Sequence, residues 1–242
     1  MIQAEGIFAG GATKPYIEEI YDSDGYLIDV KMHGYTKIRD NAFQGCYSLS
    51  LASLPDEIVS IGIDAFTGCA NLALTSLPPG VTYIGYNAFS ACANLALTSL
   101  PDGITSIGEQ TFFDCTNLAL TSLPAGITYI GMGAFYGCTN LALTSLPSEI
   151  TKIESSAFYG CTNLTFTSIP AGVTYIGYSA FYGCTGLTEL TFMGTPTESI
   201  ESDSFQDCTN LTTINVPWAE GAVANAPWGA TNATIHYNYT GG

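Results

Sequence analysis

The stretch Ala125–Pro147 reads AGITYIGMGAFYGCTNLALTSLP, and it decides the fold because the chain repeats it many times. Its last ten residues, Cys138–Pro147, recur letter for letter at Cys115–Pro124. Near copies lie at Cys69–Pro78, Cys92–Pro101 and Cys161–Pro170. Self-similarity at a short, fixed period is the signature of a repeat architecture. The fold therefore follows from one unit and from the way its copies stack.

Eight cysteines mark the period, which is 23 residues for six intervals and 24 for the last. They are Cys46, Cys69, Cys92, Cys115, Cys138, Cys161, Cys184 and Cys208. A phenylalanine stands three residues before each: Phe43, Phe66, Phe89, Phe112, Phe135, Phe158, Phe181 and Phe205. An isoleucine stands eight residues before each cysteine and a leucine three residues after it. Eight units thus cover residues 36–217.

A unit of this length is too short to bury its own apolar face, so stacked units have to share one continuous core. We therefore predict a β-rich repeat solenoid. The Leu-x-Leu-x-x-Leu-Pro stretch is expected to supply one short parallel strand per turn, which proline ends. The Ile-Gly-x-x-Ala-Phe-x-Gly-Cys stretch is expected to turn back as a single helical or 3₁₀ turn.

The repeated apolar residues are interpreted as structural ladders, each packing on its own kind, where a missing methyl group leaves a cavity. Equivalent cysteines on adjacent turns have parallel Cβ vectors and two neighbours each, which favours buried, reduced thiols over disulfides. No Cys-x-x-Cys occurs and the chain has only two histidines, so no metal site is predicted.

Both ends of a solenoid need caps, because terminal turns expose core and strand edges. Residues 15–35 are predicted to form an N-terminal β-hairpin with Ile28, Val30 and Met32 facing inward. Residues 1–14 are interpreted as a leader or linker through which the chain could join a larger complex, and they lack the pattern of a secretory signal. Residues 218–242 form the predicted C-terminal cap, in which Trp218 and Trp228 cover the last turn.

The pattern L-P-x-x-I-T-x-I-G-x-x-A-F-x-G-C-T-x-L resembles the BspA-like class of leucine-rich repeats over about three quarters of the chain. This resemblance implies a leucine-rich-repeat solenoid used for surface attachment and for recognition of proteins or glycans, without catalysis. The middle units depart from the family in one respect. They read Leu-Ala-Leu-Thr-Ser-Leu-Pro where family units usually read L-x-x-I-x-I-P, which leaves the inward register of that strand open.

Composition excludes several partners. The chain has 5 Lys and Arg against 21 Asp and Glu, and Lys152 is the only basic side chain of these two types after residue 40. Nucleic acid and anionic membranes require basic residues, so neither is expected as a partner. No apolar run reaches the roughly 20 residues that span a bilayer, so no membrane insertion is expected.

No enzymatic activity and no cofactor are predicted. His33 and His236 lie in opposite caps, so they cannot act together in a straight solenoid. Asp56 and Asp102 occupy equivalent positions two turns apart, roughly 9 Å, as in an inverting glycosidase pair, but both lie in polar turns where nothing raises a pKa. Asp22-Ser-Asp24-Gly25 resembles the start of a calcium loop but lacks the later ligands, which favours a plain turn.

Function is expected where the units differ. The variable positions carry the tyrosines Tyr83, Tyr129, Tyr175, Tyr86, Tyr178, Tyr136, Tyr159 and Tyr182. Tyrosine offers large contact area at low entropic cost, as in antibody paratopes, and stacked rings suit sugars. Tyrosine also packs well across neighbouring strands, so ladders that only stiffen the solenoid are an equal alternative.

Two hypotheses follow. In the first, the chain is a recognition or adhesion module for a protein or glycan on a host or bacterial surface. In the second, it is a structural spacer in a larger virion or surface assembly. The tail resembles those of repeat proteins from gut-type bacterial and prophage genomes, which implies a phage tail or bacterial cell surface as its location.

Overall fold

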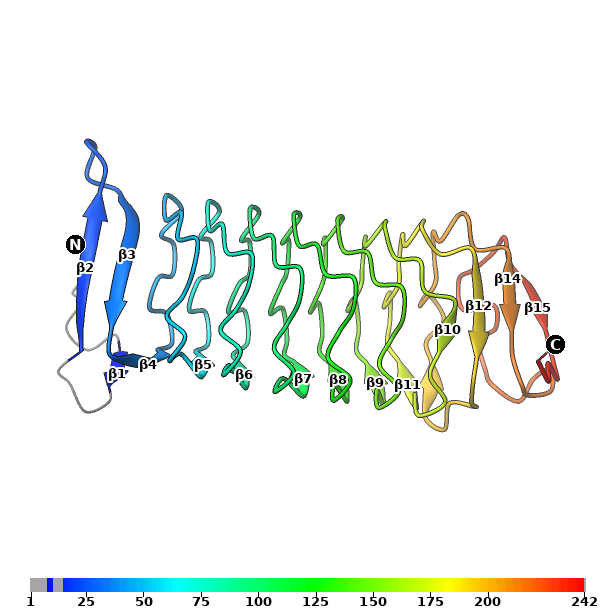
Figure 1. Cartoon of the computed structure of the whole chain (residues 1–242). Coiled ribbons are helices and arrows are strands. Elements are labelled where there is room, and N and C mark those ends of the chain that lie inside the picture. The colour runs from blue at the N-terminus through cyan, green and yellow to red at the C-terminus, as the bar shows by residue number, and fades with distance from the viewer. Residues whose placement is uncertain (1–7, 11–14, 242) are drawn as a thin grey trace.

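The computed structural model describes residues 8–10 and 15–241 and shows one elongated solenoid with its two ends far apart (Figure 1). Fifteen short strands and many turns make up the described chain, which contains no α-helix or 3₁₀-helix. In particular, the described part has no helix that could cross a membrane. The leucine-rich-repeat solenoid predicted from the period is confirmed, and each turn of it is called a rung below.

Parallel strands of mostly two residues line one long side of the solenoid (Figure 1). They are β4 (Tyr35–Ile38), β5 (Ser60–Ile61), β6 (Tyr83–Ile84), β7 (Ser106–Ile107), β8 (Tyr129–Ile130), β9 (Lys152–Ile153), β11 (Tyr175–Ile176) and β13 (Ser199–Ile200). Except between β6 and β7, each isoleucine pairs with the isoleucine of the next rung, as Ile130 does with Ile153. The 23-residue period therefore sets the register.

These strands are not where the sequence analysis placed them. The Leu-x-Leu-x-x-Leu-Pro stretch of the middle units forms no strand, and the strand follows the proline turn instead. In Leu74-Thr75-Ser76-Leu77 two exposed residues stand between two buried ones, so the alternation that a regular strand needs is lost. Only a few backbone hydrogen bonds join the Leu-x-Leu-x-x-Leu stretches of neighbouring rungs, such as the bond from Ala96 N–H to the Leu74 carbonyl at 3.1 Å.

The expected helical turn is also absent from the described rungs, and two kinds of hydrogen bond replace it. Ser90 N–H donates to the Asn87 carbonyl three residues back, and Cys92 N–H donates to the Phe89 carbonyl. The amide between them, Ala91 N–H, donates across the rungs to the Phe113 carbonyl at 2.7 Å. Because every second amide is used between rungs, a continuous helix cannot form.

Left-handed backbone recurs twice in seven of the eight repeat units and explains two small-residue positions. The residue before cysteine has positive φ, which is 70° at Gly137 and 54° at Asp114. The residue four positions before that one also has positive φ, as at Asn87, where φ is 54°. Glycine, Asn and Asp tolerate this conformation best, which accounts for most of the residues found there.

The opposite long side gains regular strands only near the C-terminus. They are β10 (Ser168–Ile169), β12 (Glu189–Phe192), β14 (Thr213–Asn215) and β15 (Thr234–His236), which pair in that order and in parallel. In β12 the buried residues Leu190 and Phe192 alternate with exposed and half-buried ones, which restores the strand pattern. β15 shows that the C-terminal segment forms a ninth rung.

Trp228 closes this ninth rung. It is fully buried, its carbonyl accepts the Phe205 amide at 2.8 Å, and its indole N–H donates to the Ala224 carbonyl at 2.7 Å. Trp218 packs edge to face on Trp228 with ring centroids 6.3 Å apart. The two tryptophans thus lie over the C-terminal end of the core.

A hairpin lies at the other end, formed by β2 (Tyr16–Tyr21) and β3 (Leu27–His33). Val30 and Met32 are buried, whereas Ile28 is half-buried and Leu27 is buried in its place, because the register shifts near Tyr21. Asp22 accepts the Asp24 and Tyr26 amides at 3.0 and 2.8 Å, so the acidic stretch forms a turn. β1 (Phe8–Gly10) pairs antiparallel with β4. The rest of the predicted leader lies outside the described residues.

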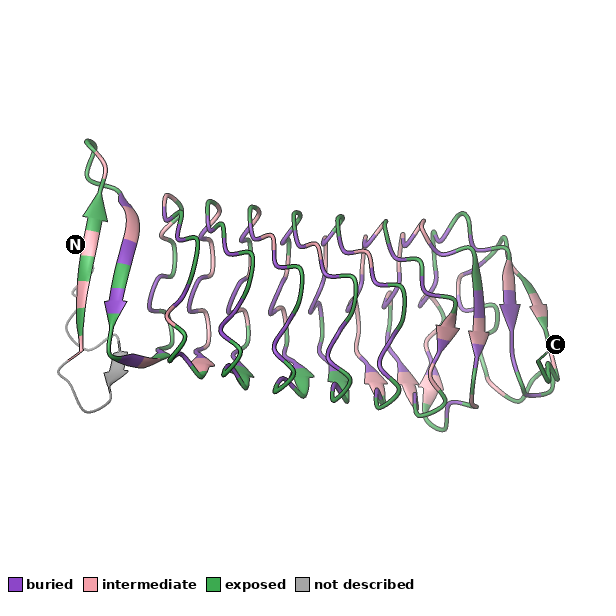
Figure 2. Cartoon of the chain, in the orientation of Figure 1, coloured by how far each residue is buried: buried purple, intermediate pink, exposed green. Residues whose placement is uncertain are grey.

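The core is a set of stacked ladders that run the length of the molecule (Figure 2). Phenylalanine rings from Phe43 to Phe205 stack rung on rung, with centroids 5.2–5.6 Å apart. Every cysteine is a free thiol, and all but the half-buried Cys46 are buried. The shared core gives the solenoid a rigid axis.

The strand ladder is interrupted between β6 and β7, which are the end strands of two separate sheets. Thr111 stands here where most units have alanine, and it is fully buried. Its hydroxyl lies 3.1 Å from the Gly108 carbonyl oxygen and 3.5 Å from that of Gly85. A Cβ on Gly108 would meet the Tyr86 ring at 2.6 Å, whereas one on Gly131 would meet the backbone of the preceding rung. We attribute the gap at the strands to the extra bulk of threonine, because the turns of the two rungs stay joined, as by Phe89 N–H to the Thr111 carbonyl at 3.0 Å.

Candidate functional site

The residue before each buried isoleucine points outward, and together these residues form one row along the strand side. We call this row the edge ladder; it consists of Lys37, Ser60, Tyr83, Ser106, Tyr129, Lys152, Tyr175 and Ser199. The row arises because side chains alternate across a strand, so an inward isoleucine forces its neighbour outward. Adjacent members lie one rung apart, about 4.8 Å.

Three of the predicted tyrosines belong to the edge ladder, but the structure does not bring all three together. Tyr83 is 50% exposed and lies on the N-terminal side of the interruption. Tyr129 is 36% exposed and Tyr175 is half-buried, and Lys152 lies between them in register. The ladder therefore presents one isolated tyrosine and one pair that flanks a cation.

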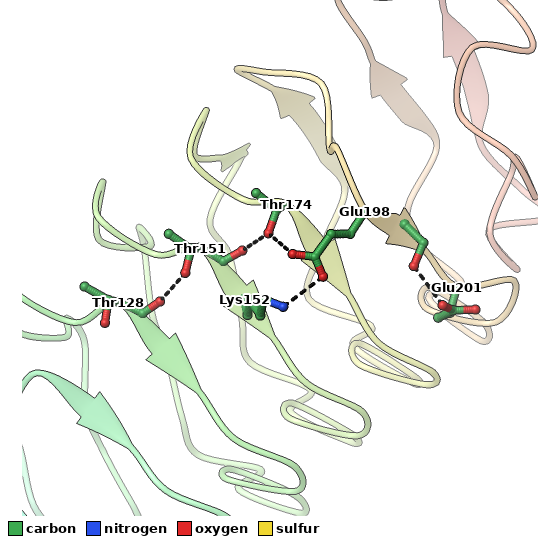
Figure 3. Close-up of polar contacts among 7 residues, drawn as sticks. Thr128, Thr151, Lys152, Thr174, Glu198 and Glu201 are labelled. Carbon is green, nitrogen blue, oxygen red and sulfur yellow. Dashed lines mark hydrogen bonds and ion pairs between the residues drawn. The ribbon is translucent and has the colours of Figure 1, made fainter.

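Hydrogen bonds between rungs hold the segment around Lys152 in place (Figure 3). The hydroxyls of Thr151 and Thr174 each donate to the carbonyl of the threonine one rung before, at 3.1 Å. Lys152 Nζ donates to Glu198 Oε2 at 2.8 Å. Thr174 Oγ1 also lies 3.1 Å from Glu198 Oε1, so its single proton is shared between this carboxylate and the Thr151 carbonyl. The hydrogen bond to Glu198 raises the pKa of Lys152, so the ammonium is fully charged at neutral pH.

The ladder tyrosines are hydrogen-bonding groups at neutral pH. Partial burial and then the Glu154 carboxylate raise the pKa of Tyr129 above its usual value of 10.0. Burial also raises the pKa of Tyr175, against a lowering contribution from its hydrogen bond with Ser155. Both phenols therefore stay protonated and can donate to a ligand oxygen.

Tyr86 and Tyr178 lie just past the strands, and both are more than half exposed. They belong to rungs four apart, so they do not meet. The Tyr86 ring occupies the space beside Gly108 at the interruption. A hydrogen bond to Glu201 raises the pKa of Tyr178, which ties that ring to the rung bearing β13. Each of the two therefore adds exposed aromatic area next to the edge ladder on its own rung.

The remaining predicted tyrosines form a separate row with Phe113. Tyr136, Tyr159 and Tyr182 stack face to face with centroids 4.5 Å apart, and Phe113 stacks on Tyr136 at 4.7 Å. All four are half-buried, so their faces contact one another rather than solvent. Tyr182 donates to Asp207, and this bond raises its pKa to about 12. This geometry favours the stiffening alternative for these three tyrosines.

The cysteine row shows no sign of catalytic chemistry. Each buried thiol donates to the carbonyl of the phenylalanine 26 or 27 residues earlier, as Cys115 does to Phe89 at 3.0 Å. Burial raises the pKa of Cys115 well above its usual value, so the nucleophilic thiolate does not form at neutral pH. His33 in β3 and His236 in β15 lie at opposite ends of the solenoid (Figure 1).

No group of three or more His, Cys, Asp or Glu side chains that could hold a metal ion occurs in residues 8–10 and 15–241. The structure does contain a feature that sequence reasoning missed. A cleft of about 740 Å³ opens on β4, β5 and β6 and is lined by Lys37, Arg39 and Tyr83 among others. In the sequence, the only indication of this cleft is that two of the five Lys and Arg residues, Lys37 and Arg39, stand two positions apart.

The pattern that organises this surface is found in known proteins. The BspA type leucine-rich repeat region, in six copies, matches residues 36–165 and 120–222. These ranges cover most of the chain. The chain belongs to the BspA-type leucine-rich repeat family. Its membership confirms the resemblance seen in the repeat.

Solved structures share this BspA-type fold. A leucine-rich cell surface protein from Faecalibacterium prausnitzii is 23% identical, with a TM-score of 0.61 over 85% of this chain and 71% of its own. A leucine-rich repeat protein from T. pallidum is 25% identical, with a TM-score of 0.52 over 86% of this chain and 89% of its own. No curated protein matches the sequence.

Proposed function

We propose that this chain is a non-catalytic recognition module that binds a protein or glycan through its edge ladder. The carrying observation is that Tyr83 and Tyr129 stand exposed at equivalent positions of two hydrogen-bonded sheets on the same side of the solenoid. A rigid scaffold that holds tyrosines in fixed register loses little entropy on binding. Paired donors and a cation at Tyr129, Lys152 and Tyr175 add polar specificity.

A surface setting, on a bacterial cell or a phage tail, is part of this proposal. The Faecalibacterium prausnitzii protein of the same fold is described as a cell surface protein. Buried thiols of raised pKa, and the absence of a metal-binding cluster from the described residues, support a role without catalysis. The net charge of −16 further disfavours nucleic acid as the target.

The test is binding of the purified protein to intact bacterial cells and to cell-wall fractions. The informative variant combines Tyr83→Ser, Tyr129→Ser and Tyr175→Ser, because serine already occupies the same position in other rungs. We expect saturable binding by the wild type and at least a tenfold loss in the triple variant. A tenfold loss corresponds to about 1.4 kcal/mol, less than one good aromatic anchor supplies.

The matched control combines Ser106→Ala and Ser199→Ala, which changes two ladder positions outside the cleft on β4, β5 and β6 without removing an aromatic ring. This control should bind like the wild type, and thermal unfolding should show that both variants keep the fold. Equal binding by the tyrosine variant and the wild type would contradict the proposal.

A structural spacer is the second candidate, and the N-terminal hairpin favours it. Within the described chain β2 pairs only with β3, so its outer edge is open, and Tyr16 and Tyr21 are exposed there. An open strand edge can accept a strand from a neighbouring subunit. If the chain binds neither cells nor cell walls but assembles through this hairpin, the spacer role replaces recognition.

A further inference from the structure

The cleft on β4, β5 and β6 has the size of a small-ligand site. Its volume of about 740 Å³ lies within the range of about 300–1,000 Å³ that is usual for ligand pockets. Its lining spans three rungs, roughly 10 Å, with Lys37 and Arg39 on the first, Ser60 on the second, and Thr82 and Tyr83 on the third. One or two sugar units fit this span.

The charge of the cleft differs from that of the molecule. Lys37 and Arg39 are exposed, and neither forms an ion pair among residues 8–10 and 15–241. Among the described residues that line the cleft, Asp40 is the single carboxylate, which leaves a net positive charge there in a chain of net charge −16. Uncompensated cations side by side in a concave site attract an anionic group.

One carboxylate oxygen of Asp40 already accepts a hydrogen bond from the backbone. Its Oδ1 accepts the Ile63 amide at 2.7 Å, across the rungs. Gly62 makes this approach possible, because a Cβ there would lie 2.5 Å from both the Asp40 amide nitrogen and Oδ1. The second oxygen of Asp40 has no such bond, so it can accept a hydrogen bond from a ligand hydroxyl.

We propose that this cleft binds an acidic sugar residue of a glycan. The sugar carboxylate pairs with Lys37 and Arg39, which suits the bidentate geometry of guanidinium. The apolar face of the ring packs on the half-exposed Tyr83 ring, and the hydroxyls contact Ser60, Thr82 and Asp40. This inference rests on the proposed function, because it names a ligand class for the N-terminal end of the same edge ladder.

The test measures binding of three probes by calorimetry or ligand-observed NMR. Methyl β-D-glucuronide carries the carboxylate, methyl β-D-glucoside is its neutral counterpart, and acetate is the carboxylate without the sugar. We expect the glucuronide to bind at least tenfold more tightly than either, because a hydrogen bond to a charged group typically adds a factor of ten or more. Equal affinity for the two glycosides, or for acetate and the glucuronide, would overturn the inference.

Two lysine variants locate the site. Lys37→Gln should weaken glucuronide binding about tenfold, whereas Lys31→Gln should leave it unchanged. Lys31 lies in β3 outside the cleft lining, and both variants remove one positive charge. Arg39→Gln and Tyr83→Ser should also weaken binding, with the melting temperature checked for each. Glucuronide binding that survives Lys37→Gln and Arg39→Gln would place the ligand elsewhere.

The results separate this inference from the proposed function. If the wild type binds cell walls but does not distinguish the two glycosides, the cleft assignment fails and recognition by the ladder stands. If the glucuronide binds through Lys37 but no cell or cell-wall fraction is bound, the cleft stands and the proposed surface role fails.

Discussion

The buried cysteine combines two properties that the rung needs. Its sulfur fills a fully enclosed space, and its S–H donates to a carbonyl that also accepts a backbone amide, as the Phe89 carbonyl accepts both Cys115 Sγ and Cys92 N–H. Alanine would leave a cavity and remove the donor, and serine would bury a more polar group. The spacing of the cysteines thus reflects packing across rungs.

This role predicts how the thiols react. In the native protein at pH 8, a thiol reagent should label at most one cysteine, the half-buried Cys46, because burial keeps the other seven protonated and covered. Under denaturant all eight should react. Mass spectrometry after timed labelling makes the comparison, and rapid native labelling of Cys115 or Cys138 would contradict the buried row.

The interruption between β6 and β7 is a local feature of two neighbouring rungs. Thr128 N–H and Gly131 N–H donate to the preceding rung at 3.0 and 2.9 Å, but no backbone bond of the equivalent amides Thr105 and Gly108 occurs in the described structure. Asn87 beside it has a buried side-chain oxygen with no partner among the described residues. The solenoid is therefore locally less tightly held here.

Hydrogen exchange tests this. We expect the amides of Thr105 and Gly108 to exchange about fivefold faster than those of Thr128 and Gly131, since each strand bond is worth about 1 kcal/mol. Thr111→Ala restores the usual residue and should slow both amides toward the values of the neighbouring rungs. Residue-resolved NMR measures it, and equal rates in the wild type would show that the ladder is continuous.

Sequence reasoning predicted the ladders well, because Phe, Cys and Ile recur at fixed spacing and only a shared core explains that. It misplaced the strand, since two-residue strands have too little alternation to detect and Leu-Ala-Leu-Thr-Ser-Leu reads as strand-like. It missed the ninth rung, where Trp228 replaces alanine and the motif disappears. The interruption depends on the single residue Thr111, and the cleft on the way Lys37, Arg39 and Tyr83 come together on successive rungs, which appears only when rungs are stacked.

For the whole molecule, the thiols predict a loss of stability at high pH. Folded-state pKa values of the seven buried cysteines are raised above the usual 9.0. Above about pH 9 the unfolded chain loses protons that the folded protein keeps, so the free energy of unfolding falls as pH rises. Below pH 9 this contribution is fully present. The slope is up to about 1.4 kcal/mol per pH unit for each thiol.

Urea unfolding at pH 7, 8, 9 and 10 measures this, with a steep drop in midpoint expected between the last two. A variant with Cys115→Ala and Cys161→Ala should be less stable at pH 7 but lose less between pH 9 and 10. A midpoint that does not change over that interval would contradict the raised pKa values.

In the whole molecule, the residues that hold the solenoid together differ from those that form its variable surface. Core ladders and the stacked row from Phe113 to Tyr182 stiffen the long axis, whereas the edge ladder carries the residues that differ between rungs. Because each rung contacts only its neighbours, a change at one ladder position alters the surface without disturbing distant rungs. Such a fold can therefore change its surface residues while it keeps its shape.

The most direct test of the central claim is hydroxyl-radical footprinting of the protein bound to bacterial cell-wall fragments. The account predicts protection of Tyr83, Tyr129 and Tyr175, with no change at the exposed hairpin tyrosines Tyr16, Tyr21 and Tyr26. Protection confined to the hairpin, with the edge ladder as reactive as in the free protein, would show that the solenoid is a spacer and that its strand side recognises nothing.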